Sequence, residues 1–279
     1  MIDMLIIALI VLSIFLSSLL SLAVILFLLF LFLLVRPAKK REVNEKLLCE
    51  YAHRGLHGDG VPENSLEAFE LACKSGYGIE LDVQLSRDGE VMVFHDYTLI
   101  RMTGCDKKLC ELDAEELKKL TLGESDQTIP TFKEVLALVD GRVPLLVELK
   151  GESTDVSLCA PVAEILKGYS GEYCIESFNP MLVREMKKQL PGVFAGQLYT
   201  NVVRDKKKAS ALNILLTCMA LNCLARPDFV AYNQLDRNSL PVKLTTKFFK
   251  AEKFIWTAKG EDDRAKAKDF GEYAIFEMK

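Results

Sequence analysis

Between Met4 and Val35 the chain contains no charged residue, and this run constrains the fold more than any other feature of the sequence. As a continuous α-helix it would be about 48 Å long, whereas the hydrocarbon core of a bilayer is about 30 Å thick. We therefore expect residues 1–36 to be one membrane-spanning anchor that is tilted or extends beyond the bilayer. A cleaved signal peptide is less favoured, because the run is longer than an h-region, no basic residue precedes it and no small-residue cleavage site is evident.

The charges that flank this run predict its orientation. Asp3 is the only charged residue before it. Basic residues gather after it, at Arg36, Lys39, Lys40, Arg41 and Lys46. Cytoplasmic flanks carry the excess of Lys and Arg, so we expect a basic juxtamembrane linker over residues 37–48. Everything that follows would lie in the cytoplasm, as the soluble part of a single-pass membrane protein.

Residues 49–279 alternate between strand-like and helix-like segments. Short apolar runs lie near residues 51, 79, 145, 173, 194, 229, 253 and 273, and amphipathic or capped segments separate them. Strands that alternate in this way with helices predict an α/β protein, a closed (β/α)₈ TIM barrel. The length of this part, about 230 residues, is ordinary for one such barrel.

Carboxylates are placed regularly on the second of these strands. Between residues 79 and 84, apolar side chains alternate with Glu80, Asp82 and Gln84, which is the period-two pattern of a strand. Both carboxylates would project from one face, roughly 7 Å apart along the chain, where they could bracket a hard cation or share a proton. The alternative is the solvated face of an amphipathic strand.

The next segment predicts a hairpin. Asp88-Gly89 is a strong signal for a two-residue type I′ turn, and in that register His95 lies opposite Asp82. A histidine beside carboxylates holds its proton more tightly, which suits acid/base chemistry near neutral pH; an ordinary surface histidine is the alternative. Because hairpin arms are antiparallel, the second arm cannot be a parallel barrel strand, and we expect a small inserted subdomain over about residues 90–128.

Two further segments place polar residues at the ends of elements. Asn64 is the expected N-cap of a helix, with Glu67 as its capping-box partner. Glu148 and Lys150 alternate at the end of the strand over residues 144–150. An ion pair at a strand end is the simpler interpretation of these two alone. The C-terminal ends of strands, however, form the active-site face of a parallel barrel, where a third carboxylate would complete a cation site.

Five short motifs follow one another in order: His53-Arg54-Gly55, Pro62-Glu63-Asn64-Ser65, Glu80-Leu81-Asp82-Val83, Arg87-Asp88-Gly89 and His95-Asp96. In this series the chain resembles the glycerophosphodiester phosphodiesterase family, which shares a superfamily with the phosphatidylinositol-specific phospholipases C. The resemblance extends from about Tyr51 to the C-terminus. It implies that residues 49–279 are a glycerophosphodiester phosphodiesterase TIM-barrel domain.

The resemblance also implies a role for each matching residue. Two histidines would be the general acid/base pair: His53 and His95. Three carboxylates would hold one divalent cation, Mg²⁺ or Ca²⁺: Glu80, Asp82 and Glu148. Two cationic residues would contact the phosphate, Arg54 and Lys150. Two aromatic residues that follow barrel strands are further candidates for substrate contact, Phe178 and Trp256. All of these residues are present in the sequence.

The activity implied is hydrolysis of a glycerophosphodiester to sn-glycerol 3-phosphate and an alcohol, in glycerophospholipid metabolism. Two alternatives stay open. One is a lysophospholipase D-type phosphodiesterase that acts on membrane lysophospholipids, which would require an apolar trough leading from the site. The other is an inactive, membrane-tethered binding module, which the presence of every expected catalytic residue disfavours. We expect a small water-soluble substrate, and a lipid bilayer as partner only through the N-terminal helix.

Three features depart from the family pattern. Ser65 stands where threonine is usual, and the N-terminal span is found in only some members. The last strand lacks the usual glycine-rich, aspartate-ended pattern and runs from Tyr273 to Glu277, which leaves the shape of one pocket wall open.

Cysteine content and net charge exclude other classes of protein. All eight cysteines follow the apolar run, and none belongs to a C-x-x-C pair, so in a reducing compartment we expect free thiols and no zinc site. The formal net charge of −4 gives no basic surface for nucleic acid.

One later segment is unusually apolar. Residues 205–224 predict a long helix, and its part from Ala209 to Leu224 is too short and too interrupted by asparagine to span a membrane. We expect a helix that covers the barrel; a surface that rests on the membrane is the alternative.

Overall fold

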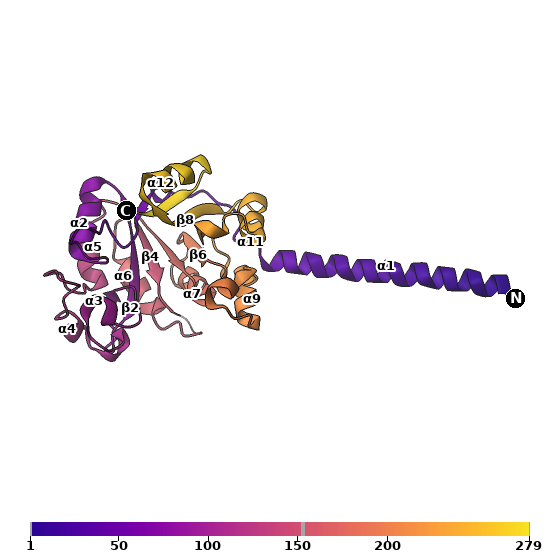
Figure 1. The fold of residues 1–279 in the computed structure, drawn as a ribbon, viewed down its shortest axis with the longest axis horizontal. Coiled ribbons are helices and arrows are strands. Elements are labelled where there is room, and N and C mark those ends of the chain that lie inside the picture. The colour runs from indigo at the N-terminus through magenta and orange to yellow at the C-terminus, as the bar shows by residue number, and fades with distance from the viewer. Residues whose placement is uncertain (1, 152–153, 279) are drawn as a thin grey trace.

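The structure is a computed structural model that describes residues 2–151 and 154–278. Its first helix, α1 (Ile2–Leu34), projects away from the rest of the chain (Figure 1). The part from Leu9 to Leu34 is long and apolar enough to cross a membrane. An N-terminal signal sequence can have the same length and apolar composition. Most of the apolar side chains of α1 are exposed, and near its end Phe32 contacts Phe248 and Phe249.

A closed barrel of parallel strands forms the body of the chain. The sheet has nine strands in the order β1-β9-β8-β7-β6-β5-β4-β2-β3, and β1 also pairs with β2, which closes it. The pairing of β3 with β2 is antiparallel, and the strands of the barrel itself run parallel. The predicted (β/α)₈ barrel is therefore confirmed. Its strands are β1 (Tyr51–Ala52), β2 (Gly78–Leu85), β4 (Leu145–Leu149), β5 (Tyr173–Ser177), β6 (Ala195–Tyr199), β7 (Phe229–Asn233), β8 (Glu252–Lys259) and β9 (Tyr273–Glu277).

Helices connect the strands and cover the outside of the barrel (Figure 1). The longer ones are α2 (Leu66–Ser75), α5 (Phe132–Val139), α6 (Cys159–Lys167), α7 (Pro180–Gln189) and α12 (Gly260–Asp269). Shorter ones are α8 (Val202–Lys206), α9 (Ala211–Thr217), α10 (Asn222–Ala225), α11 (Leu240–Lys243), η1 (Glu45–Leu47), η3 (Gln234–Asp236) and η4 (Leu244–Phe248).

Alternation along the strands divides the interior into layers. On β2, the residues Ile79, Leu81 and Val83 belong to the large core between sheet and helices. The side chains that alternate with such residues fill the barrel itself, where Leu146, Phe229 and other apolar residues make a second core. Glu80, Asp82 and Glu148 lie on the same alternating positions and are buried as well. A polar layer thus occupies the barrel interior beside an apolar one.

The segment between β2 and α5 packs around a small core of its own. It contains β3 (Val91–Val93), α3 (Ile100–Thr103), η2 (Leu109–Glu111) and α4 (Ala114–Leu117). Its buried residues form a cluster separate from the two barrel cores: Met92, Phe94, Leu99, Leu109, Leu112, Ala114, Leu117, Leu122 and Ile129.

The predicted hairpin register is wrong by one residue. Val83 pairs with Val93, and the N–H of Phe94 donates to the carbonyl of Asp82 at 2.9 Å, so Phe94 and not His95 lies opposite Asp82. The turn has three residues, because the Ser86 N–H donates to the Glu90 carbonyl at 3.0 Å. Gly89 adopts a φ of 83° within it, as in three-residue loops that end in a left-handed glycine.

Two predicted elements are shorter than the sequence indicates. The strand expected near residue 51 contains only Tyr51–Ala52, because the preceding Leu47 belongs to the turn η1. The single helix expected over residues 205–224 is wrong: the chain forms α8, α9 and α10 instead. Left-handed residues interrupt it, Lys207 with a φ of 48° and Met219 with a φ of 53°, so a continuous helix is impossible there.

Close packing of the inner barrel layer depends on Gly196 in β6. A Cβ atom at this position would lie 2.0 Å from Cε2 of Phe229. We expect Gly196→Ala to lower the free energy of unfolding by about 1–3 kcal/mol, because it overpacks the core. Gly168→Ala is the matched control, since its Cβ would lie 3.6 Å from its nearest neighbour, the carbonyl oxygen of Ile165. Denaturant unfolding of both variants measures the difference, and equal stabilities would contradict this account of the packing.

Candidate active site

Three carboxylates meet inside the barrel at the C-terminal ends of two strands. Glu80 and Asp82 come from β2 and Glu148 from β4, and the register places Asp82 beside Glu148. One ligand atom from each lies within 4.8 Å of the others. All three side chains are buried, with exposures of 2%, 1% and 7%. The strands therefore bring together the three residues that the sequence picks out.

Lys150 and Arg54 provide the positive charge that this cluster needs. Lys150 Nζ lies 2.8 Å from Asp82 Oδ1 and 2.8 Å from Glu148 Oε1. Arg54 Nε lies 3.6 Å from Asp82 Oδ2, and the Arg54 backbone N–H donates to Glu80 Oε2 at 2.8 Å. Buried charges are tolerated when they are paired in this way.

The backbone after β1 is shaped to deliver these contacts. Arg54 has a φ of 55° and Gly55 a φ of 80°, so the chain reverses direction immediately after the strand. A Cβ at position 55 would lie 2.8 Å from the Cβ of Ala68 in α2. Glycine is required here because α2 approaches so closely and because φ is positive.

Asn64 is a site residue whose role the sequence analysis missed. Its predicted role as N-cap is wrong, since Ser65 caps α2 by accepting from the Ala68 N–H at 3.1 Å. Asn64 instead donates from Nδ2 to Asp82 Oδ2 at 2.8 Å and is 1% exposed. It fixes the orientation of the Asp82 carboxylate. The adjacent Asn64 and Ser65 are both suitable caps, so the sequence left the cap ambiguous and gave no signal for the contact with Asp82.

Burial and the charges around the acids shift their pKa values in opposite directions. Burial, together with the charges of Asp82 and Glu148, raises the pKa of Glu80 well above its usual value. Burial also raises the pKa of Glu148 to about 7, against the opposing effect of Lys150. For Asp82 the burial penalty is outweighed by Lys150, His95 and Arg54, and its pKa is lowered. Asp82 is thus the carboxylate that is most firmly ionised.

Glu176 is a fourth buried carboxylate that the sequence analysis did not single out. It lies on β5 beside Glu148, is 1% exposed, and its Oε2 has no hydrogen-bond partner. Burial and the charges of Glu80 and Glu148 raise its pKa well above the usual value. The alternation of apolar residues along β5 is compatible with an inward-facing Glu176. No neighbouring motif in the sequence marked it as a site residue.

His53 is held by the last residue of the last strand. Its Nδ1 lies 2.8 Å from Oε1 of Glu277, so the unusual end of β9 contributes a carboxylate that orients this histidine. The hydrogen bond from His53 is the main reason why the pKa of Glu277 falls to about 2. His57 lies close to both residues, and its buried Nε2 has no hydrogen-bond partner. Burial lowers the pKa of His57.

His95 is held by its neighbour in sequence and by the barrel. Its Nδ1 lies 2.6 Å from Asp96 Oδ1, and Asp96 in turn accepts from Arg101 Nε at 2.5 Å. Gln84 Nε2 donates to the carbonyls of residues 94, 95 and 96, at 2.8, 3.2 and 2.9 Å. This clamp brings the segment after β3 to the mouth of the barrel. Burial lowers the pKa of His95, although the Asp82 charge opposes the shift.

The two aromatic candidates contact each other. The rings of Phe178, after β5, and Trp256, in β8, meet edge to face with centroids 5.5 Å apart. Trp256 Nε1 donates to the carbonyl of Ala231 at 3.0 Å. Phe178 is 38% exposed, so it is available to a ligand at the mouth.

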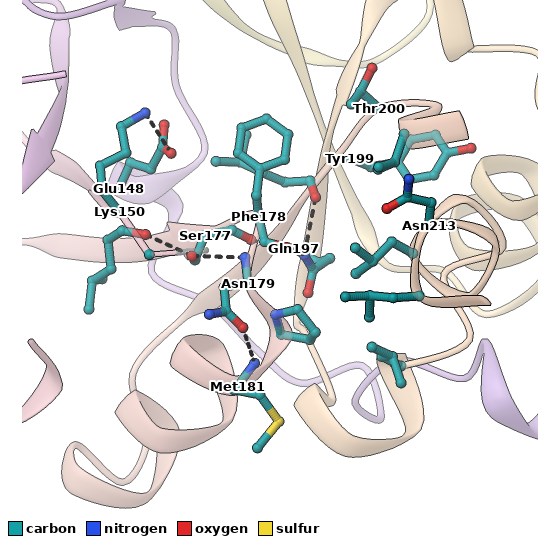
Figure 2. Close-up of a pocket in the computed structure, with 18 of the residues that line it drawn as sticks. Glu148, Lys150, Ser177, Phe178, Asn179, Met181, Gln197, Tyr199, Thr200 and Asn213 are labelled. Carbon is teal, nitrogen blue, oxygen red and sulfur yellow. Dashed lines mark hydrogen bonds and ion pairs between the residues drawn. The ribbon is translucent and has the colours of Figure 1, made fainter. Parts of the chain in front are cut away.

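A pocket of about 800 Å³ opens beside this site. His95, Glu148, Lys150 and Phe178 line one end of it, whereas His53, Arg54, Glu80, Asp82 and Trp256 are not among its lining residues. In Figure 2 Glu148 and Lys150 stand at one side of the view, Tyr199 and Asn213 at the other, and Phe178 between them. The pocket thus extends from the edge of the carboxylate cluster, at Glu148, toward Tyr199 and Asn213.

The carboxylate cluster fits a hard divalent cation. Mg²⁺ and Ca²⁺ prefer oxygen ligands at about 2.0–2.6 Å, and carboxylate oxygens from three residues lie close enough to share one ion. Burial and, after it, the negative charges of the neighbouring carboxylates raise the pKa values of Glu80 and Glu148. A divalent cation would relieve this repulsion.

Comparison with known proteins places the chain among phosphodiesterases. A glycerophosphodiester phosphodiesterase of Caldanaerobacter subterraneus subsp. tengcongensis is 37% identical over 160 residues, 53% of this chain. This match spans 65% of that relative's length. The fold superposes on an Oleispira antarctica phosphodiesterase, solved with the product sn-glycerol-3-phosphate, with a TM-score of 0.68 and 26% identity, over 82% of this chain and 92% of that one.

A second solved structure agrees. The glycerophosphodiester phosphodiesterase of Thermotoga maritima superposes with a TM-score of 0.64 at 26% identity, over 85% of this chain and 96% of that one. The model of one family matches residues 53–276, which include most of the barrel, the insertion and every site residue that the sequence predicts. The chain belongs to the glycerophosphoryl diester phosphodiesterase family.

Proposed function

We propose that this protein hydrolyses glycerophosphodiesters to sn-glycerol 3-phosphate and an alcohol. The observation that carries the proposal is the convergence of Glu80, Asp82 and Glu148 with Lys150 and Arg54 at one mouth of the barrel. A phosphodiester gains negative charge in its transition state, and fixed positive charge stabilises it. The product bound to the Oleispira antarctica relative supports glycerol 3-phosphate as the product here.

Glu80, Asp82 and Glu148 would hold one cation, Mg²⁺ or Ca²⁺. When bound, the cation would act as a Lewis acid that polarises the phosphoryl oxygens. The remaining work falls to side chains of this chain. Lys150 and Arg54 would hold the phosphate, and Asn64 would keep Asp82 in the orientation that ligation requires. Phe178 and Trp256 would form the wall against which the substrate packs.

His53 and His95 would move the protons. In each ring Nδ1 contacts a carboxylate, Glu277 for His53 and Asp96 for His95, which leaves Nε2 as the atom that faces the reaction. One histidine would take the proton of the attacking hydroxyl, and the other would give a proton to the leaving alkoxide. The carboxylate behind each ring stabilises the charge that the ring then carries.

The catalytic barrel would face the cytoplasm, tethered by α1 as a single-pass anchor. The basic residues after α1 support this orientation. In the structure this linker lies against the barrel, with Arg41 hydrogen-bonded to Asp228 and to the carbonyl of Val193. The tether would therefore hold the barrel close to the bilayer surface.

Removing one cation ligand tests the metal site. We expect Glu148→Gln to abolish Mg²⁺ or Ca²⁺ binding, measured by calorimetry, and turnover with it, while the circular dichroism spectrum stays unchanged. Glu252→Gln is the control, because this carboxylate begins β8 at the opposite end of the barrel and pairs with Lys40. Full activity in excess chelator would contradict the cation assignment.

Removing the histidines tests the proton transfers. His53→Ala and His95→Ala should each lower kcat by about 10²–10⁴-fold. The double variant should be little worse than either single one, because residues that act as a unit are not additive. His57→Ala, the third histidine, is the comparison and should keep kcat within about tenfold. Near-normal turnover of either single variant would remove that histidine from the mechanism.

Thiol labelling tests the orientation of the barrel. Cys110 and Cys218 are exposed and free, and both follow the anchor in sequence. An impermeant maleimide added to intact cells should leave them unlabelled, and the same reagent should label them after lysis. Labelling without lysis would place the barrel outside the cell.

A further inference from the structure

The pocket beside the site is larger and less polar than a glycerophosphodiester requires. Its volume of about 800 Å³ lies in the upper part of the range of about 300–1,000 Å³ that pockets for drug-sized ligands have. The polar end at Glu148 and Lys150 already accounts for a phosphate. The part of a ligand that occupies the rest of the pocket must be apolar, because the wall there is apolar.

The far end of the pocket is lined by the segment that follows β6. Val202 in α8, Leu212 and Leu216 in α9, and Met219 and Leu221 just after it all face the pocket. We call this part of the pocket, lined by these five residues, the apolar arm. It is continuous with the polar end, since residues of both ends line one pocket. The same segment was predicted to be a covering helix, and its breaks into α8, α9 and α10 are what turn it toward the site.

The apolar arm lies directly beside the end of the anchor helix. Asn222 lines the pocket and donates from Nδ2 to the carbonyl of Val35, the residue that follows α1, at 3.1 Å. The ring of Phe32 in α1 packs on Phe248 and Phe249 with centroids 4.9 and 4.7 Å apart. In Figure 1, α9 and α11 lie on the side of the barrel from which α1 projects. A bilayer crossed by α1 would meet the barrel on this side.

The surface around the arm suits a membrane containing anionic lipid. Leu212, Ile214 and Leu215 of α9 are exposed, Leu212 by 55%. Three consecutive exposed lysines, residues 206–208, immediately precede them. Segments that bind a membrane surface insert apolar side chains into the interface. Basic residues beside them attract the anionic headgroups.

We propose that the protein takes single-chain phospholipids, lysophospholipids, from the bilayer surface, with the acyl chain in the apolar arm. This inference rests on the proposed function and names its substrate class. Water would be added across the phosphodiester: the P–O bond to the headgroup alcohol breaks, the water oxygen bonds to phosphorus, and the alcohol leaves with a proton. The products are the acylated glycerol phosphate and the headgroup alcohol. One arm receives one chain, so a two-chain phospholipid does not fit.

A chain-length series tests the inference. The full chain in lipid nanodiscs is assayed with its cation against glycerophosphocholine and against octanoyl, lauroyl and palmitoyl lysophosphatidylcholine. The value of kcat/KM should rise by about two- to fourfold for each methylene that the arm buries, until the arm is full. Turnover of glycerophosphocholine with no gain from any acyl chain would overturn the inference and leave the proposed function standing.

A matched pair of variants locates the effect. Leu216→Trp fills the apolar arm, and the ratio of kcat/KM for the palmitoyl substrate to that for glycerophosphocholine should fall at least about tenfold. Leu224→Trp lies eight residues further along the same segment and outside the pocket lining, and it should leave this ratio unchanged. Equal ratios in the two variants would overturn the role of the arm.

Photolabelling decides the inference independently of turnover. A lysophosphatidylcholine with a diazirine at the end of its acyl chain is irradiated on the protein without added cation, and the labelled peptides are mapped. Label within residues 202–221 supports acyl-chain binding in the apolar arm, whether or not the preparation hydrolyses the substrate. Labelling there without any hydrolysis would overturn the proposed function and leave the binding of the chain standing. Label confined to α1 would overturn the arm as the chain's binding place.

Discussion

The site depends on one electrostatic constraint: buried carboxylates inside the barrel must be kept close together. Glu80, Asp82, Glu148 and Glu176 lie on neighbouring positions of three strands, where like charges repel strongly because little water screens them. Lys150 bridges two of these residues and Arg54 lies beside Asp82, but two cationic groups do not balance four acids. Burial, together with the charges of the neighbouring acids, raises the pKa values of Glu80, Glu148 and Glu176. A divalent cation held by these carboxylates would offset part of their negative charge.

The barrel makes this concentration of charge possible by dividing its interior. Apolar residues such as Leu146 and Phe229 fill one layer, and the acids occupy the next inward-facing positions toward the strand C-termini. Packing in the apolar layer, including the close contact at Gly196, therefore supports the site without touching it. Outside the sheet, the segment after β6 does more than cover the barrel. Its broken helices form a wall of the pocket instead of a plain outer cover.

Much of the site could be predicted from the sequence, because strand periodicity fixes which side chains share a face. The convergence of Glu80, Asp82 and Glu148 follows from alternation and from the rule that strand C-termini meet at one end of a barrel. The contacts of Asn64 and Glu176 could not be predicted, since each depends on a neighbour from a distant element. The hairpin register was wrong because one extra turn residue shifts every pairing. His95 reaches the site all the same, through the hydrogen bonds of Gln84.

By itself the sequence determined the long apolar N-terminal helix, the eight parallel strands and the order of the family motifs, because these are local patterns of hydrophobicity and residue type. Only the tertiary structure decided how the ends of the chain complete the site: Glu277 from the last strand orients His53 from the first. It also decided that the apolar segment after β6 lines a pocket next to the end of α1. Barrel closure is the reason for the first, because β1 and β9 become neighbours only when the sheet closes. Backbone breaks at Lys207 and Met219 are the reason for the second, and a hydrophobic pattern does not reveal them.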